Sequence, residues 1–78
     1  MKQHTKNYLK HYNYGIDDII LCEICGSIAV DLHHIIYKSQ GGSDSIDNII
    51  ALCRKCHDMA HNETFSKEYL KNIHESNF

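Results

Sequence analysis

The sequence predicts a small α+β fold in which two short strands are followed by helices, and whose core needs extra stabilisation. The 78 residues suit a single domain, and a hydrophobic core of that size rarely supplies enough stability alone. Segments 27–36 and 48–53 are rich in β-branched and apolar residues and indicate strands. Four cysteines and seven histidines make a metal or a disulfide the expected source of added stability.

The N-terminal residues 4–15, HTKNYLKHYNYG, predict a short helix. Thr5 is the expected N-cap and Gly15 the stop signal. The apolar face of this helix is weak and consists of Tyr8, Leu9 and Tyr12. A frayed N-terminal arm is the alternative.

A polar loop separates the two predicted strands. Residues 37–47 are rich in Ser, Gly and Asp, and we expect Gly41 and Gly42 to provide turn geometry. The core of the strand region should consist of Ile35, Ile36, Ile49, Ile50 and Leu52.

Two helices are expected after the second strand. Residues 54–62 are compatible with a helix, and Ser66 is a candidate N-cap for another over residues 66–76. The inward face of the last helix should contain Tyr69, Leu70 and Ile73. We therefore expect one domain, 1–78, divided into a helical arm (1–21), a core (22–62) and a C-terminal helix (63–78).

Two CxxC pairs, Cys22/Cys25 and Cys53/Cys56, are separated by 27 residues. A CxxC turn lets two thiolates converge on one ion, and two such turns complete a tetrahedral four-thiolate zinc site. Since protein ligands would fill all four positions, this zinc would be structural, and its binding energy would become folding energy. The alternatives are two disulfides or a redox CxxC, but a redox pair normally belongs to a βαβ pattern, which this sequence lacks.

The charge of the chain argues against strong non-specific binding of nucleic acid. Eight Lys and Arg against ten Asp and Glu give a net charge of −2. Any DNA affinity must therefore come from a local patch, a metal or a larger assembly.

The N-terminus lacks the apolar run of a signal peptide, and no later segment approaches the length of a membrane span. We expect a reducing cytoplasmic location, where paired cysteines more often bind metal than form disulfides.

Four histidines near the cysteines suggest a second metal site. His57 and His61 are four residues apart, hence on one face of the predicted helix, where two imidazoles can bind one ion. His57 directly follows Cys56, so a zinc ion would fix it near the strand that carries His33 and His34. Three imidazole ligands leave positions open for water and substrate, and one histidine remains to handle protons. Taken alone, the His57/His61 pair also suits an exposed helix face.

The segment from Cys22 to His61, CEIC…VDLHHIIYKSQGGSDSIDNIIALCRKCHDMAH, resembles the HNH endonucleases. The similarity lies in the His-His pair, the polar loop with Gly-Gly, the Asp-Asn before a short apolar strand, and the CxxCH helix with a further His. It covers about half of the chain and leaves out the flanking helices. It implies a zinc-stabilised ββα-metal, treble-clef-like core with N- and C-terminal helices, and a metal-dependent endonuclease that hydrolyses DNA.

The resemblance also implies roles for individual residues. The three letters of HNH fall on His34, Asn48 and His57. His34 would be the general base that activates a water, and Asn48 would hydrogen-bond across the loop and hold the backbone of His34. His33 and His57 would bind the catalytic ion, and His61 occupies a place similar to the third histidine ligand of nuclease colicins. Many relatives have Asp where His33 stands, so the all-histidine set departs from them.

These residue types suit phosphodiester hydrolysis. One divalent ion can polarise the phosphoryl oxygen and stabilise the leaving 3′ oxygen, while a histidine takes the proton of the water. Imidazole ligands favour Zn²⁺ or Ni²⁺, but Mg²⁺ or Mn²⁺ could be the working ion, since phosphate oxygens and waters complete the coordination. Because adjacent residues on a flat strand point to opposite faces, we expect the backbone to twist or bulge near His34, so that both His33 and His34 reach one site.

Other polar residues are candidates for supporting roles. Asp31 alternates with His33 and would either orient a ligand histidine or be solvated. Contacts to DNA are expected from Lys38, Arg54 and Lys55, and hydrogen bonds to the DNA backbone from Ser39, Gln40 and Ser43. A solvated surface is the alternative for each of them.

Two other functions fit the same sequence. The chain could be a non-catalytic zinc module that binds DNA or a protein, although the complete set of His33, His34, Asn48 and His57 argues against this. It could also be the nuclease subunit of a larger phage packaging or restriction assembly. Metal content discriminates between the first two functions, since one site supports the module and two sites support the nuclease.

Overall fold

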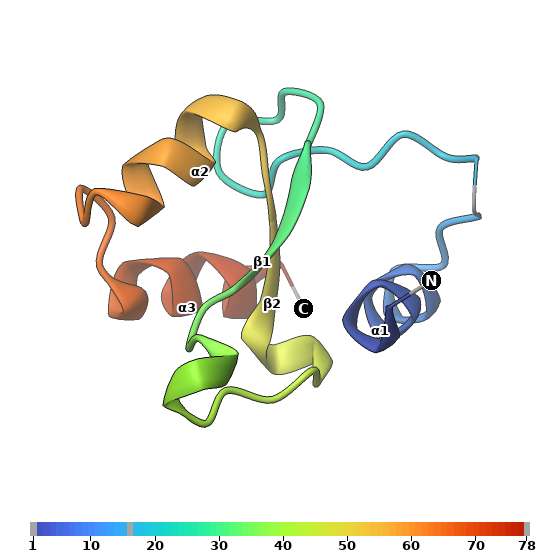
Figure 1. Cartoon of the computed structure of the whole chain (residues 1–78). Coiled ribbons are helices and arrows are strands. Elements are labelled where there is room, and N and C mark those ends of the chain that lie inside the picture. Colours follow the sequence, from blue (N-terminus) through green and yellow to red (C-terminus); the bar gives the residue numbers. More distant parts are fainter. Residues whose placement is uncertain (1, 16, 78) are drawn as a thin grey trace.

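The computed structural model describes residues 2–15 and 17–77 (Figure 1). The elements in chain order are helix α1 (Gln3–His11), strand β1 (Asp31–His34), the 3₁₀ turns η1 (Lys38–Gln40) and η2 (Ile46–Asn48), strand β2 (Ile49–Leu52), and helices α2 (Arg54–His61) and α3 (Lys67–Ser76). This confirms the predicted small α+β fold, in which two strands are followed by helices.

The two strands form an antiparallel sheet, in which His33 lies opposite Ile50 and His34 opposite Ile49. Strand β1 has 4 residues and is much shorter than the predicted 27–36. The chain before it turns back at Gly26, whose φ is 81°. Residues 27–29 consequently pair with the preceding segment 20–22 and do not extend β1.

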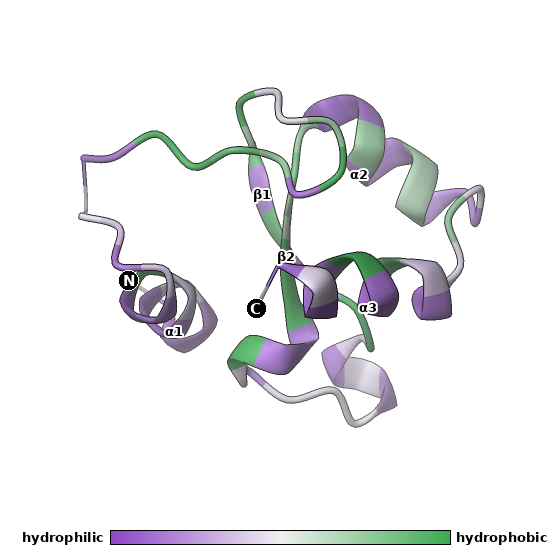
Figure 2. Ribbon diagram, turned by 180° about the vertical axis from the view of Figure 1, so that it is seen from behind, coloured by the Kyte–Doolittle hydropathy of each residue, from purple (hydrophilic) through white to green (hydrophobic). Residues whose placement is uncertain are grey.

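The sheet is covered on both faces. On one face, Ile35, Ile50 and Leu52 pack with Leu70 of α3 and with part of α2. On the other face, Ile49 and Ala51 pack with Tyr8 of α1, together with the partly buried Leu32. Figure 1 shows α1 on one side of the strands and α2 and α3 on the other. Strand β2 is buried along its whole length, and its hydrophobic character is visible as green in Figure 2.

Most of the predicted core is confirmed, with one exception. Ile35, Ile49, Ile50 and Leu52 are buried, but Ile36 is 45% exposed. The reason is that β1 ends at His34 and the chain turns into the loop, so that Ile36 no longer follows the alternation of the strand.

The helix ends give mixed results. Ser66 caps α3 as predicted, and its Oγ accepts a hydrogen bond from the backbone N of Tyr69 at 3.1 Å. The prediction of Thr5 as N-cap is wrong, because α1 begins at Gln3 after Lys2. Tyr69 is not part of the inward face, since it is 42% exposed, whereas His74 is fully buried there.

Within the described residues, no helix is long and apolar enough to cross a lipid bilayer.

A buried carboxylate connects the flanking helices to the sheet. Glu23, in the first CxxC turn, accepts hydrogen bonds from the hydroxyl of Tyr8 at 2.8 Å and from Nδ1 of His74 at 2.7 Å. It also accepts one from the backbone N of Ala51 at 3.0 Å. Helices α1 and α3 and strand β2 therefore meet at one side chain.

Candidate functional site

The four cysteines converge beside the first turn of α2. Cys22 and Cys25 come from the turn before β1, and Cys53 and Cys56 from the junction of β2 with α2. All four sulfur atoms lie within 4.8 Å of one another, and Sγ of Cys25 lies 3.5 Å from Sγ of Cys53 and 3.8 Å from that of Cys56. A tetrahedral zinc ion with bonds of about 2.3 Å holds its sulfurs about 3.8 Å apart. The cluster therefore fits a four-thiolate zinc site.

The alternatives for the cysteines do not fit the structure. All four cysteines are free thiols, which does not fit the alternative of two disulfides. The only sheet among the described residues has two antiparallel strands and contains no βαβ unit, the usual setting of a redox CxxC. Hydrogen bonds of Ser27 lower the pKa of the Cys25 thiol to about 6, whereas burial raises the pKa of the Cys56 thiol, so the two thiols are shifted in opposite directions.

Three histidines form a second cluster, on the face of the sheet that packs against α2. His33 comes from β1, and His57 and His61 come from successive turns of α2. One ring nitrogen of each lies within 4.8 Å of the others, and the Nε2 atoms of His57 and His61 are 3.1 Å apart. The ring centre of His33 lies 5.4 Å from that of His57 and 5.6 Å from that of His61. The structure thus brings together the three residues that we predicted as ligands of one ion.

The surroundings of this cluster favour metal binding. His33 is only 5% exposed. Burial lowers its pKa to about 4, with a further contribution from the charges of His57 and His61. His33 is therefore neutral at physiological pH, which is the form of imidazole that binds metal. At the rim, Oδ2 of Asp31 lies 3.0 Å from Nε2 of His57, the nitrogen that also faces His61. Asp31 therefore contacts the same ring nitrogen of His57 that faces the cluster. It does not contact the opposite ring nitrogen, where a carboxylate that orients a ligand histidine would lie.

His34 faces the opposite side of the sheet from His33. Its Nε2 lies 2.8 Å from Oδ1 of Asp44, and its ring centre lies 4.6 Å from that of His4 in α1. The pairing of the strands is regular here, since His34 lies directly opposite Ile49. The predicted bulge near His34 is therefore wrong, because a regular ladder sends successive side chains to alternate faces.

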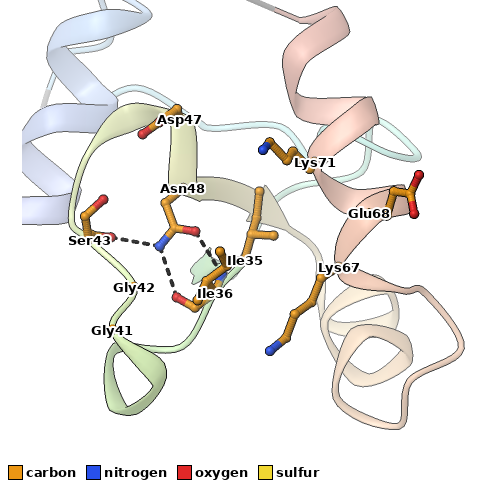
Figure 3. A pocket seen from close by; sticks show the side chains of 10 residues that line it. All are labelled: Ile35, Ile36, Gly41, Gly42, Ser43, Asp47, Asn48, Lys67, Glu68 and Lys71. Atoms are coloured by element: carbon orange, nitrogen blue, oxygen red, sulfur yellow. Dashed lines mark hydrogen bonds between the residues drawn. The ribbon is translucent and has the colours of Figure 1, made fainter.

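Asn48 clamps the loop that follows β1 (Figure 3). Its Oδ1 accepts a hydrogen bond from the backbone N of Ile36 at 2.8 Å, and its Nδ2 donates to the backbone oxygens of Ile36 at 3.0 Å and Ser43 at 2.8 Å. The clamp thus holds the chain two residues beyond His34. A Cβ at Gly42 would lie 1.8 Å from the carbonyl oxygen of Ile36, so this position requires glycine. The pocket drawn in Figure 3 lies between this loop and α3, and none of the histidines lines it.

The predicted DNA-contacting cations lie in different surroundings. Lys38 forms an ion pair with Asp44, with 3.3 Å between Nζ and Oδ2. Arg54 and Lys55 are exposed at the start of α2, beside the cysteine cluster.

Comparisons with known proteins bear on this arrangement. The HNH endonuclease family matches residues 22–63, more than half of the chain. The chain belongs to this family. It is similar to the Type IV methyl-directed restriction enzyme EcoKMcrA of Escherichia coli (strain K12), with 34% identity over 64 residues that cover 69% of this chain and 23% of the relative. It is also similar to the Probable mobile endonuclease C of Enterobacteria phage T4, with 55% identity over 31 residues, 40% of this chain and 15% of the relative.

The HNH match contains both donor clusters but not the flanking helices. All four cysteines and the three clustered histidines lie within residues 22–63, whereas α1 and α3 lie outside. The chain covers less than a quarter of the length of either relative.

Sequence reasoning missed three residues around the HNH histidines. His4 and Asp44 contact His34 from α1 and from the loop. Lys67 of α3 hydrogen-bonds to Gln40, and its Nζ lies 5.0 Å from the ring centre of Tyr37, beside the pocket that His33 lines. The periodicity of the sequence could not reveal these contacts, because each joins residues that are ten or more positions apart.

Proposed function

We propose that the chain is a metal-dependent HNH endonuclease that hydrolyses phosphodiester bonds of DNA. The observation that carries this proposal is the presence of two separate donor clusters, one of four thiols and one of three imidazoles. A non-catalytic zinc module needs only the first cluster. The second cluster has the ligand number of catalytic sites, which leave positions open for water and substrate.

Each cluster has its own ion in this proposal. The four cysteines hold a structural zinc, and His33, His57 and His61 hold the catalytic ion. The bound ion supplies charge neutralisation for the scissile phosphate and for the leaving 3′ oxygen. The three imidazoles favour a transition ion such as Zn²⁺ or Ni²⁺, and with phosphate oxygens and waters in the remaining positions the site also accepts Mn²⁺ or Mg²⁺.

His34 is the proposed general base. The hydrogen bond from His34 holds the pKa of Asp44 below its ordinary value, so the carboxylate is charged at neutral pH. The carboxylate accepts the proton on Nε2 of His34, which leaves the lone pair of the neutral ring on Nδ1. Nδ1 can then take a proton from the attacking water. Asp44 thus selects the tautomer of His34, and Lys38 holds the second oxygen of Asp44.

Because His33 and His34 lie on opposite faces of β1, the substrate must approach along the edge of the sheet. Among the described residues, β1 pairs only with β2, so no strand pairs with its other edge. A phosphate lying across this edge would meet the His33 cluster on one face and a water held by His34 on the other. Lys38, Arg54 and Lys55 would contact neighbouring phosphates.

Nicking of supercoiled plasmid DNA with a panel of divalent ions tests the proposal. We expect the wild type to nick the plasmid and His34→Ala to lose about 100-fold or more in rate, the usual contribution of a general base. His34→Ala should keep the ion bound by His33, His57 and His61, whereas His57→Ala should lose that ion together with cleavage. Lys10→Ala, an exposed change in α1, is the matched control.

Two outcomes would contradict parts of the proposal. An unchanged rate in His34→Ala would remove the assignment of the base. A wild-type chain that cleaves with none of the ions and binds one ion per molecule would be the non-catalytic zinc module.

We also propose that the chain acts within a larger phage or restriction assembly. Its net charge of −2 gives little general affinity for DNA, and its relatives are much longer than the matched segment. The isolated chain should therefore bind DNA weakly at physiological salt, which fluorescence anisotropy with a labelled duplex measures. Tight binding by the chain alone would contradict the need for a partner.

A further inference from the structure

A third group of metal-binding side chains lies on the α1 face of the sheet. It contains His4 from α1, His34 from β1 and Asp44 from the loop between η1 and η2. One donor atom of each lies within 4.8 Å of the donors of the other two, and all three residues are half-buried. Only His34 and Asp44 lie within the segment that matches the HNH family.

We propose that His4, His34 and Asp44 form a further binding site for a divalent transition ion, with Zn²⁺ as the best fit. Two imidazoles and one carboxylate are ligands that zinc takes readily, whereas magnesium prefers oxygen ligands. The three residues come from three different segments, so a bound ion would attach α1 to the sheet.

The donor atoms are already spaced for such an ion. Zinc ligands at about 2.1 Å from a tetrahedral ion lie about 3.4 Å from one another. Nε2 of His34 and Oδ1 of Asp44 are 2.8 Å apart, and no pair of donors in the group exceeds 4.8 Å. Small side-chain movements therefore suffice to enclose an ion.

The neighbouring contacts orient the ligands. Lys38 holds Oδ2 of Asp44 at 3.3 Å, which leaves Oδ1 facing the histidines. His4 meets His34 by ring contact, with an angle of 56° between the ring planes. Its ring nitrogens have no hydrogen-bond partner within residues 2–15 and 17–77, so a ring nitrogen of His4 is available to an ion.

Occupation of this site would switch off the proposed base, a consequence that rests on the proposed function. An ion on Nε2 of His34 displaces the proton that Asp44 accepts, and in the neutral ring that proton moves to Nδ1. Nδ1 then has no lone pair for the attacking water. Excess zinc is therefore expected to inhibit cleavage through His4, a residue with no part in the proposed reaction.

Native mass spectrometry of the zinc-loaded chain tests the binding. We expect His4→Ala to bind one zinc ion fewer than the wild type, and Asp44→Asn likewise. Lys10→Ala, in the same helix but outside the group, should bind as many as the wild type. Equal zinc counts in the wild type and His4→Ala would overturn the proposal.

A measurement on the unaltered chain makes the test independent of variant folding. As the last equivalent of Zn²⁺ is added, the imidazole NMR signals of both His4 and His34 should shift together. Signals that stay in place at saturation would also overturn the proposal.

Cleavage assays separate this inference from the proposed function. His4→Ala should keep the basal rate and need a several-fold higher zinc concentration for inhibition. Equal inhibition of the wild type and His4→Ala would remove the regulatory role. A chain that cleaves no DNA, but loses one zinc ion on His4→Ala, would contradict the nuclease proposal and leave this site intact.

Discussion

Nδ1 of His74 donates a hydrogen bond to Oε1 of Glu23 at 2.7 Å, across 51 positions of sequence. Nε2 of the same ring lies 2.5 Å from the carbonyl oxygen of Ile46. Both ring nitrogens therefore donate, as they do in a charged imidazolium. Since the ring is fully buried, His74 and Glu23 form an internal ion pair that attaches α3 to the first CxxC turn.

Replacing His74 should destabilise the fold strongly. His74→Gln leaves Glu23 as a buried charge without its cationic partner, and breaking a buried pair in this way costs about 3–5 kcal/mol. Urea unfolding of the zinc-loaded protein measures the difference. Lys71→Gln, an exposed change in the same helix, is the control and should change the free energy of unfolding by less than about 0.5 kcal/mol. Equal losses in the two variants would contradict the buried pair.

The stability that His74 provides should depend on pH. Burial alone would lower the pKa of His74, but the hydrogen bonds of Glu23 and Ile46 outweigh it and hold the pKa above the ordinary value of 6.5. A raised folded-state pKa means that this stability is fully present below about pH 6.5 and is lost as the pH rises through the folded-state value. The wild type should therefore lose its advantage over His74→Gln as the pH rises above about 6.5 and through the folded-state pKa of His74. A difference in unfolding free energy that stays constant over this range would contradict a charged His74.

Removal of the ion from the cysteine cluster should unfold the chain. Structural zinc binds with about 10–16 kcal/mol, which equals or exceeds the whole stability of a typical domain. A strong chelator, or Cys56→Ser, should abolish the cooperative thermal transition seen by circular dichroism. His57→Ala is the matched control, because it alters the neighbouring residue of the same helix and leaves the thiols intact. A metal-free chain with the native spectrum would contradict the structural role.

Gly42 should tolerate no side chain. In Gly42→Ala the new Cβ would overlap the backbone oxygen of Ile36, so the loop must move and the Asn48 clamp must weaken. We expect a loss of about 2–4 kcal/mol in unfolding free energy. Gly15→Ala is the control, since its nearest new contact is a side-chain atom of Asp18 at 3.3 Å. Similar losses in both variants would contradict the close approach at Gly42.

Asn48 should protect the loop from opening. Asn48→Ala removes three hydrogen bonds and should cost about 2–3 kcal/mol. The local readout is the exchange rate of the Ile36 amide hydrogen, which should rise in the variant well beyond the change seen for other amides. Asn48→Asp retains an acceptor for that amide but places a carboxylate against two carbonyl oxygens, so it should be no more stable than the alanine variant. Unchanged exchange at Ile36 would contradict the clamp.

Local signals predicted the parts of the molecule that depend on neighbours in sequence. The CxxC spacing, the His57/His61 interval and the Ser66 cap each involve residues within about one helical turn, and the structure contains all three arrangements. Thr5 failed as a cap because Gln3 already belongs to the helix, a choice that local propensity leaves open.

The sequence patterns could not predict contacts between segments that are not neighbours in the chain. The Glu23–His74 pair joins a turn to the last helix, and His4 and Asp44 reach His34 from separate segments. The expected bulge near His34 failed for a physical reason: β2 is buried on both faces and keeps its partner strand in regular register.

The position of Glu23 inside the first CxxC turn links the docking of two helices to the cysteine cluster. Glu23 reaches the hydroxyl of Tyr8 and the ring of His74 only when the turn from Cys22 to Cys25 has closed. We therefore expect α1 and α3 to dock against the sheet only while an ion holds that turn closed. The metal supply would then control the packing of the first and last helices as well as the cysteine cluster itself.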